Sequence, residues 1–587
     1  MTTWHNDNNR TGWQQSESTL TPSALTTCNS QPCFGLLWQW TGISGPVYAQ
    51  PLAVAGLPTI GGCTSPCSLV FIATEQDMLY AFNASSNSQT PIWSTDLAAN
   101  VGDTYVNCVG LVPSFAPCQT QPVGPTVGVT GTPVIDTNSN LLYVVGAVQN
   151  GQVSVGYELF AVDITTGNVQ GSIAIGGTVS GQAPPPPPPG LCTSTYPGNP
   201  GSTISFDSSH IQRAGLLLLN HNLVYVAFSA NPPEENLNGW LFGYRYSNPT
   251  FTPVTPFVPT PFGTGGGIWQ SGAALAAEVK QDGTTYIYAA SGNGTFDAAA
   301  TQPVGNDVGN SLVKIQVNTS TGAMTGVDYY SPFNMNTYLG DGVCEEDADF
   351  GSGGVLLFPE AFYHDLNNAN GHAYPNMSVE GDKQSVLYTL DRDHLGKFNT
   401  NGGNLLELSQ IRFPVETDQG FWSTPAYWKY VDSGSNPHYY LYASVSTDSK
   451  PQRPFPMDMY QLATSGTSGP IGAISSSTNA LFCFSTTPTV SSSGTNGGGI
   501  VWAIENRNFD NPLNPDCNGS VLSAGLHALD ATNFQNELYS SRNLNAGLGL
   551  ASTFSSPTVF QGRVYVGTQT KVNVFGLCAT QSGGCKQ

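Results

Sequence analysis

Two segments of the sequence carry oxygen-bearing side chains that could bind a metal ion. Asn293 lies in SGNGTFD, directly after the apolar run TTYIYAA, and four acidic residues lie close together in CEEDAD, residues 344–349. Calcium takes roughly six to eight oxygen ligands, which carboxylate and amide groups can supply. The simpler interpretation is that Asn293 forms a turn between glycines and that the acidic residues are solvated loop charges. The sequence leaves both interpretations open.

Other catalytic chemistry has little support in the sequence. The eight histidines are scattered, and no His-Glu-x-x-His, Gly-x-Ser-x-Gly or phosphate-binding glycine loop occurs. We therefore do not expect a zinc protease, a serine hydrolase or a nucleotide-binding enzyme.

The composition favours strands and loops over helices. Only 10% of the residues are charged, and the chain contains 66 glycines and 42 prolines. With 17 basic and 39 acidic residues, the net charge of −22 repels nucleic acids and anionic membranes. No apolar run approaches the roughly 18 residues of a spanning helix. We expect no nucleic-acid partner and no membrane span.

A pair of apolar runs recurs along the chain and predicts the architecture. Clear copies are LVFIAT with LYAFNASSN, LLYVVG with LFAVDITTG, and VYVGT with VNVFG; eight such units occur. Four strands of about six residues with their connections fill one unit. The pattern predicts an all-β fold, a single eight-bladed β-propeller of four-stranded antiparallel blades over residues 1–587, rather than separate sandwiches. Pairing of GLLWQWTG with the last unit would close the ring.

Two long loops are expected at about residues 100–125 and 180–205. The second contains the proline run APPPPPPG at 183–190. Because proline favours an extended backbone, we expect a stiff surface loop, with a ligand for a proline-binding module as the alternative.

The twelve cysteines predict disulfide bonds in an oxidising compartment. Convergent zinc-binding spacing is absent. Four pairs lie close in sequence, and four other cysteines have no evident partner: Cys28 with Cys33, Cys63 with Cys67, Cys108 with Cys118, and Cys578 with Cys585; then Cys192, Cys344, Cys483 and Cys517. We expect a secreted or periplasmic protein, and since MTTWHNDNNR lacks the layout of a leader, we expect the leader to have been removed.

The repeats resemble those of the eight-bladed quinoprotein alcohol dehydrogenases. AVDITTG at 161–167 matches most of the family's tail Ala-x-Asp-x-x-Thr-Gly-x-x-x-Trp, and AFNASSNSQTPIW, ending at Trp93, resembles a stretched copy. The opening WHNDNNRTGWQQSESTLTP also resembles the family's N-terminal segment. The resemblance covers nearly the whole chain and implies pyrroloquinoline quinone (PQQ) and calcium as cofactors.

The resemblance also implies where the cofactors would bind. Trp269, in GTGGGIWQSG, matches the residue under the quinone ring, and Asn293 matches a calcium ligand. Lys383, in GDKQSVLYTLDRDHLG, matches a cation that hydrogen-bonds the quinone. The family's glutamate ligand falls at Glu234 or Glu235, in PPEENLNGW.

The catalytic aspartate of the family falls in DADFGSGGVLL. Asp347 matches the first Asp of the family's Asp-x-Trp-Asp segment, and Asp349 lies two residues further on. In this scheme the metal polarises a quinone carbonyl, and the aspartate takes the substrate hydroxyl proton while hydride moves to the quinone.

Several departures from the family bear on function. The family has an adjacent Cys-Cys pair whose disulfide ring lies over the cofactor, and no two cysteines are adjacent here. The Trp of the aspartate segment is also missing, EVKQDG lengthens the connection between Trp269 and Asn293, and no Cys-x-x-Cys-His haem motif occurs. These departures favour a non-catalytic scaffold that binds a carbohydrate or protein. The alternative is a dehydrogenase that uses PQQ and calcium, without haem, to oxidise an alcohol or sugar. The expected partners are a small alcohol, a sugar or polysaccharide, or another extracellular protein.

Overall fold

The computed structural model describes most of the 587 residues. The described residues are 1–28, 32–108, 118, 125–151, 154–181, 203–229, 238–296, 307–332, 349–365, 372–398, 407–412, 419–447, 454–466, 469–507, 517, 523–542, 544, 547–578 and 585.

Most strands belong to eight sheets that are each built around four antiparallel strands; six of these sheets have four strands in all, one has five because β1 (Trp13–Gln14) joins it in parallel, and one has six because β7 (Thr104–Asn107) and β8 (Thr126–Val127) extend it. In the first half of the chain these are β3 (Leu52–Leu57), β4 (Cys67–Ala73), β5 (Met78–Asn83) and β6 (Trp93–Asp96); β9 (Val134–Asp136), β10 (Leu141–Asn150), β11 (Ser154–Asp163) and β12 (Val169–Ala174); β15 (Leu217–Leu219), β16 (Leu223–Phe228), β17 (Trp240–Ser247) and β18 (Thr250–Phe257); and β19 (Ala276–Val279), β20 (Thr285–Ala290), β21 (Leu312–Val317) and β22 (Met324–Tyr330).

The second half of the chain continues the pattern. Its sheets are β23 (Leu356–Leu357), β26 (Met377–Gly381), β27 (Val386–Asp391) and β28 (Glu407–Arg412); β30 (Ala426–Val431), β31 (Pro437–Ser444), β33 (Phe455–Gln461) and β35 (Ser476–Phe482); β36 (Thr489–Ser491), β37 (Ile500–Arg507), β38 (Ser523–Asp530) and β39 (Glu537–Ser540), joined by β1 (Trp13–Gln14); and β40 (Thr558–Phe560), β41 (Arg563–Gly567) and β42 (Val572–Leu577), completed by β2 (Phe34–Trp40).

The remaining elements are short helices, strands and 3-10 turns. They are α1 (Pro22–Thr26), α2 (Leu97–Asn100), β7 (Thr104–Asn107), β8 (Thr126–Val127), β13 (Thr178–Ser180), β14 (Thr203–Ser205), β24 (Tyr363–Asp365), β25 (His372–Tyr374), β29 (Gln419–Gly420), β32 (Ser446–Thr447), β34 (Ser465–Gly466), and the 3-10 turns η3 (Gln270–Gly272) and η5 (Phe350–Ser352).

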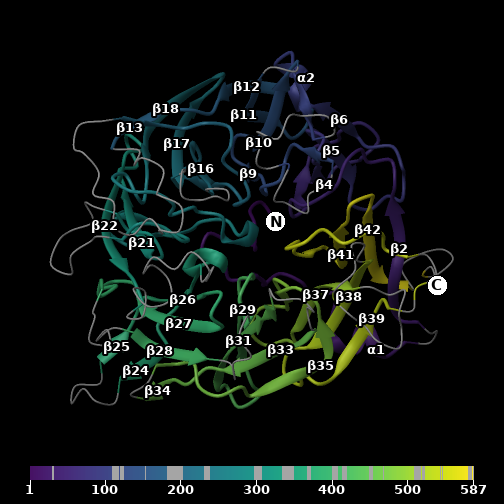
Figure 1. Ribbon diagram of the computed structural model, residues 1–587. Helices are drawn as coiled ribbons and strands as arrows, with labels where there is room; N and C mark the ends of the chain where they lie inside the picture. The colour runs from purple at the N-terminus through teal and green to yellow at the C-terminus, as the bar shows by residue number, and fades with distance from the viewer. Residues whose placement is uncertain are drawn as a thin grey trace.

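The four-stranded sheets stand around a common centre, as Figure 1 shows. Buried apolar clusters lie between neighbouring sheets and link them in sequence: β3–β6 with β9–β12, then β15–β18, and onward round the ring. Strand β16, LVYVAF, is buried at every position because neighbouring sheets cover both of its faces. This arrangement is a β-propeller, as expected.

The two ends of the chain meet in one sheet. Strand β2 pairs antiparallel with β42, with Trp40 opposite Val572, which confirms the expected pairing of the early strand with the last unit. A further apolar cluster, containing Trp38 and Trp40, packs this sheet against β4 and β5 of the first sheet. The last sheet of the chain therefore packs directly against the first.

Residues 1–14 lie across the first strands of all these sheets. Backbone carbonyls of this segment accept hydrogen bonds from Ala53, Ile135, Ala277, Leu357, Tyr427 and Val490, at 2.7–2.8 Å. The side chains of Asn8 and Gln14 donate to the carbonyls of Leu218 in β15 and Val559 in β40. The N-terminus lies near the centre of the ring in Figure 1. The segment, here called the axial segment, therefore bridges sheets that are distant in sequence.

The disulfides match the predicted short-range pairs. Cys28–Cys33, Cys63–Cys67, Cys108–Cys118 and Cys578–Cys585 are bonded, and Cys483 pairs with Cys517 across 34 residues. Cys192 and Cys344 lie outside the described residues.

The two predicted long loops are only partly described. In the first, β7 pairs with β10, so part of it is a strand. In the second, β13 pairs antiparallel with β14, while residues 182–202, including the proline run, lie outside the described residues. None of the described helices has the length and hydropathy needed to cross a bilayer.

Candidate functional site

The SGNG turn packs tightly against the glycine-rich segment that precedes Trp269. Gly292 donates its N–H to Gly267 at 2.8 Å, and the carbonyl of Asn293 accepts from Gly266 at 2.6 Å. A Cβ atom on Gly294 would lie 2.3 Å from the nitrogen of Gly266. The turn therefore requires glycine because another backbone approaches it closely.

Asp349 lies at the centre of the site. Its Oδ2 atom accepts a hydrogen bond from the indole Nε1 of Trp269 at 2.9 Å, and its Oδ1 atom accepts one from the backbone N–H of Asn293 at 2.8 Å. The Nζ of Lys383 lies 3.4 Å from Oδ2. The carboxylate is buried, with only 3% of the residue exposed. Charge-assisted contacts of this kind fix the carboxylate in one orientation.

Lys383 also faces Trp269. Its ammonium group lies 5.5 Å from the centre of the indole ring, within the range of a cation–π contact. Its backbone N–H donates to the carbonyl of Asp349 at 3.3 Å. Trp269, Asp349 and Lys383 therefore form one packed unit.

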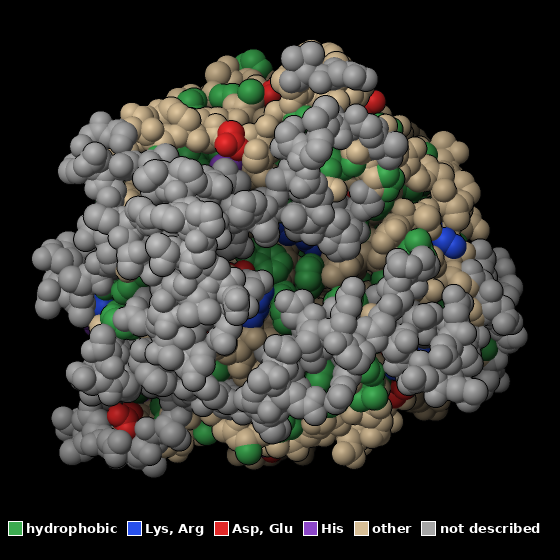
Figure 2. All heavy atoms as spheres, viewed as in Figure 1, with side chains coloured by type: hydrophobic (Ala, Val, Ile, Leu, Met, Phe, Trp, Pro, Cys, Tyr) green, Lys and Arg blue, Asp and Glu red, His purple; other side chains and the backbone are tan. Residues whose placement is uncertain are grey.

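The topology explains why these residues meet. Trp269 and Asp349 precede the first strands of two sheets, β19 and β23, whereas Asn293 and Lys383 follow the second strands, β20 and β26. Because the first and second strands are antiparallel, the start of one and the end of the other lie at the same edge. Figure 2 shows a hollow near the centre of the ring, with hydrophobic and basic side chains inside it.

Four of the predicted site residues are therefore brought together: Trp269, Asn293, Asp349 and Lys383. Asp347, Glu234 and Glu235 lie outside the described residues. Within the described part of the chain, no group of three or more His, Cys, Asp or Glu side chains could hold a metal ion.

Two residues near Trp269 were not predicted. The guanidinium of Arg213 packs on Gly272, where a Cβ atom would lie 2.3 Å from Nη1, and the ring of Phe554 lies 6.2 Å from that of Trp269. Arg213 comes directly before the apolar run AGLLLL and Phe554 lies in STFSSP, and neither segment has a spacing typical of a binding site. For Arg213, the only feature of the sequence that could have indicated a site was a single arginine directly before an apolar run.

Burial shifts the ionisation of groups beside Arg213. Desolvation raises the pKa of the Glu75 carboxyl to about 7, although Gly128 and Thr130 donate hydrogen bonds to it. Desolvation also lowers the pKa of Arg213 to about 10, against the attraction of Glu75. Both groups are buried, so their charges interact through a medium of low polarity.

The side chains around Asp349 carry chemical groups of the kinds that bind a quinone and a metal ion. They offer a flat indole, an ammonium group beside it and a carboxylate, and the adjacent turn contains Asn293, a residue whose side chain carries an amide oxygen. Asp349 already accepts contacts from protein donors, but a carboxylate has about four lone-pair positions and can also ligate a metal. Asn293 and Asp349 alone fall short of the roughly six to eight ligands of calcium, so further oxygens are needed.

The fold is similar to those of solved quinoprotein dehydrogenases. The structure of a europium-containing methanol dehydrogenase is 13% identical, has a TM-score of 0.55, and the match covers 98% of each chain. The quinohemoprotein alcohol dehydrogenase ADHIIG from Pseudomonas putida HK5 is 11% identical, with a TM-score of 0.50 and coverage of 97% of this chain and 79% of that chain. At these identities the likeness concerns the fold alone. The sequence matches no family model and no curated protein.

Proposed function

We propose that this chain is a secreted dehydrogenase that binds PQQ and a metal ion and oxidises an alcohol or sugar. The observation that carries the proposal is that Trp269, Asn293 and Lys383, from three separate segments, all contact the buried carboxylate of Asp349. The proposed framework is a single propeller of residues 1–587 with eight blades, of which six are four-stranded sheets and two are larger sheets of five and six strands. The disulfides favour an extracytoplasmic location.

Each residue has a role that suits its chemistry. Trp269 provides a flat apolar surface for the quinone, and Lys383 donates hydrogen bonds to its oxygens. Asn293, with Glu234 or Glu235, holds the metal ion through oxygen atoms. When bound, the quinone and its metal supply an oxidising carbonyl group.

Asp349 or Asp347 is the proposed base. A carboxylate oxygen of this residue takes the proton of the substrate hydroxyl group. Asp349 is held for this role by Trp269 and the backbone of Asn293, so that its oxygens keep a fixed position. Lys383 balances its negative charge at 3.4 Å.

Reconstitution tests the proposal. Purified protein is titrated with PQQ in the presence of calcium or of europium, because one similar structure is that of a europium-containing methanol dehydrogenase. Binding is followed by quenching of tryptophan fluorescence, and turnover by reduction of a dye with a panel of alcohols and aldoses. We expect saturable binding that is weakened by Asn293→Ala and Lys383→Ala.

A matched control uses another lysine of the chain. Lys429 also pairs with a carboxylate, that of Glu360, and also lies over an aromatic ring, 5.7 Å from the centre of Tyr439. Lys429→Ala should therefore leave quinone binding unchanged. Equal weakening by both lysine variants, or no binding by the unmodified protein, would contradict the proposal.

A non-catalytic scaffold for carbohydrate or protein is the second candidate. The absence of adjacent cysteines favours it, because the family places such a pair over the cofactor. Failure to bind PQQ with either metal, together with no dye reduction, would leave this candidate in place of the first.

A further inference from the structure

Trp269 is followed by a turn in an unusual backbone conformation. Gln270, Ser271 and Gly272 have φ values of 45°, 48° and 87°, so three successive residues are left-handed. Side chains disfavour this region, and such strain persists only where the surroundings impose it. The Ser271 hydroxyl donates to the carbonyl of Ser352 at 2.6 Å, and the Gln270 Oε1 atom accepts from the N–H of Ala290 at 3.0 Å. These contacts hold the turn in place.

A second left-handed residue places an aromatic ring against Trp269. Phe554 has φ of 63°, which is uncommon for a bulky residue. Its ring centre lies 6.2 Å from that of Trp269, with the two planes at 72°. This edge-to-face arrangement is a favourable aromatic contact. Phe554 lies before β40, whereas Trp269 lies before β19, so the contact spans the centre of the ring.

Arg213 connects the two strained turns. Its Nη2 atom donates to the carbonyl of Thr553, the residue before Phe554, at 3.1 Å. The same guanidinium packs on the Cα of Gly272, where a Cβ atom would lie 2.3–2.9 Å from three guanidinium atoms. Only 3% of Arg213 is exposed, and its Nη1 atom reaches the carbonyl of Thr130 at 3.5 Å. A buried charge is costly unless its contacts compensate for it, so this placement is strongly specified.

From this arrangement we infer that Phe554 is a specificity-determining wall of the ligand site on Trp269, and that Arg213 is the positioning residue that holds both rings. The inference rests on the proposed function, because the ligand is taken to be a flat ring lying against Trp269. Arg213 acts through Thr553 and Gly272 and does not itself need to touch the ligand. A flat aromatic ligand is selected because the indole and the phenyl edge together fit a thin planar ring.

The test measures PQQ affinity in the full chain by quenching of tryptophan fluorescence. Phe554→Leu removes the aromatic edge but keeps an apolar side chain, and should raise Kd about 2- to 10-fold. Arg213→Lys keeps the positive charge but removes the planar guanidinium group that contacts both turns, and should raise Kd by about 10-fold. Arg245→Lys is the matched control. Arg245 lies in β17, in the sheet of β15–β18, and it also donates to a backbone carbonyl, that of Thr319. The Arg245→Lys variant should not change Kd.

A second readout does not require the ligand. Near-ultraviolet circular dichroism reports the packing of aromatic rings, and the contribution of Trp269 is isolated by subtracting the spectrum of Trp269→Phe. We expect Arg213→Lys and Phe554→Leu to change this contribution, and both to lose their effect in the Trp269→Phe background. Thermal unfolding identifies variants that fail to fold.

The outcomes separate this inference from the proposed function. If the unmodified protein does not bind PQQ but Arg213→Lys still changes the Trp269 signal, the proposed function fails and the positioning role is supported. If the protein binds PQQ and both variants leave Kd and the Trp269 signal unchanged, the inference is overturned and the proposed function stands.

Discussion

Gly292 is the residue on which the geometry of the candidate site depends most directly. A Cβ atom at this position would lie 2.1 Å from Oδ1 of Asp349. Gly292→Ala should therefore displace Asp349, weaken PQQ binding by at least about 10-fold, and destabilise the fold by about 1–3 kcal/mol. Gly176→Ala is the control, because nothing lies within 4 Å of a Cβ atom there. PQQ titration and urea unfolding measure both effects, and equal behaviour of the two variants would refute the prediction.

Glu75 should make stability depend on pH. Its folded-state pKa is raised from 4.5 to about 7 by burial, so between these values the folded protein keeps a proton that the unfolded chain releases. Stability from this group is therefore highest below about pH 4.5 and falls as pH rises toward 7, by up to about 3 kcal/mol. Glu75→Gln should flatten this fall in urea unfolding measured at pH 5 and pH 7.5. An unchanged slope would mean that Glu75 ionises in the folded protein as it does in the unfolded chain.

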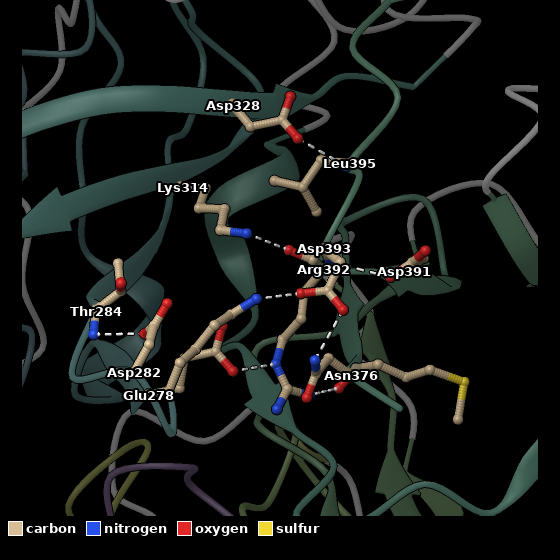
Figure 3. A network of polar contacts seen from close by, with 12 residues as sticks. Glu278, Asp282, Thr284, Lys314, Asp328, Asn376, Asp391, Arg392, Asp393 and Leu395 are labelled. Atoms are coloured by element: carbon tan, nitrogen blue, oxygen red, sulfur yellow. Dashed lines mark hydrogen bonds and ion pairs between the residues drawn. The ribbon is translucent and has the colours of Figure 1, made fainter. Parts of the chain in front are cut away.

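At the scale of elements, a network of charges joins the sheet of β19–β22 to the sheet of β23 and β26–β28 (Figure 3). Arg392, after β27, pairs with Glu278 in β19 at 3.0 Å, and Lys280 pairs with Asp393. The Lys314 ammonium donates to the carbonyl of Arg392 at 2.7 Å. The Arg392 and Glu278 side chains are only 5% and 9% exposed, so water cannot replace a lost partner.

Removing one partner of this buried pair should be costly. Arg392→Ala should lower the free energy of unfolding by about 3–5 kcal/mol, because it leaves Glu278 buried without its cation. Lys429→Ala breaks a pair whose side chains are 25% and 30% exposed, and should cost less than about 1 kcal/mol. Urea unfolding compares the two variants. Equal losses would show that burial does not set the strength of these pairs.

At the scale of the whole molecule, the axial segment should contribute to the stability of the ring. It accepts backbone hydrogen bonds from first strands as far apart in sequence as β3 and β36. Arg10, which is fully buried, donates from Nε and Nη2 to the carbonyl of Leu275 at 2.9 and 2.6 Å. The segment thus ties together sheets that are far apart in the sequence.

Deletion of residues 1–14 should lower the unfolding temperature by several degrees or more, since each 1 kcal/mol corresponds to roughly 2 °C or more in a large domain. A synthetic peptide of the same residues, added in excess, should restore part of the loss through mass action. A peptide of scrambled sequence is the control, and scanning calorimetry is the measurement. If deletion leaves the unfolding temperature unchanged, the axial segment does not stabilise the ring.

The sequence by itself determined the strand content, the repeated units, the short-range disulfides and the types of residue in the site. These features are local: short apolar runs predict strands, and cysteines a few residues apart in the sequence are close enough to bond to each other. The sequence also contains Trp269, Asn293 and Lys383 in the same order as the matching residues in the motifs of the quinoprotein alcohol dehydrogenases.

Only the tertiary structure decided which side chains meet. It placed Asp349 against Trp269 and Lys383, and it brought Arg213 and Phe554 to the same turn from segments with no recognisable spacing. The pairing of Cys483 with Cys517 and the path of the axial segment were likewise invisible in the sequence. The physical reason is that a ring of sheets joins residues through packing around a common axis, and packing depends on all the sheets at once.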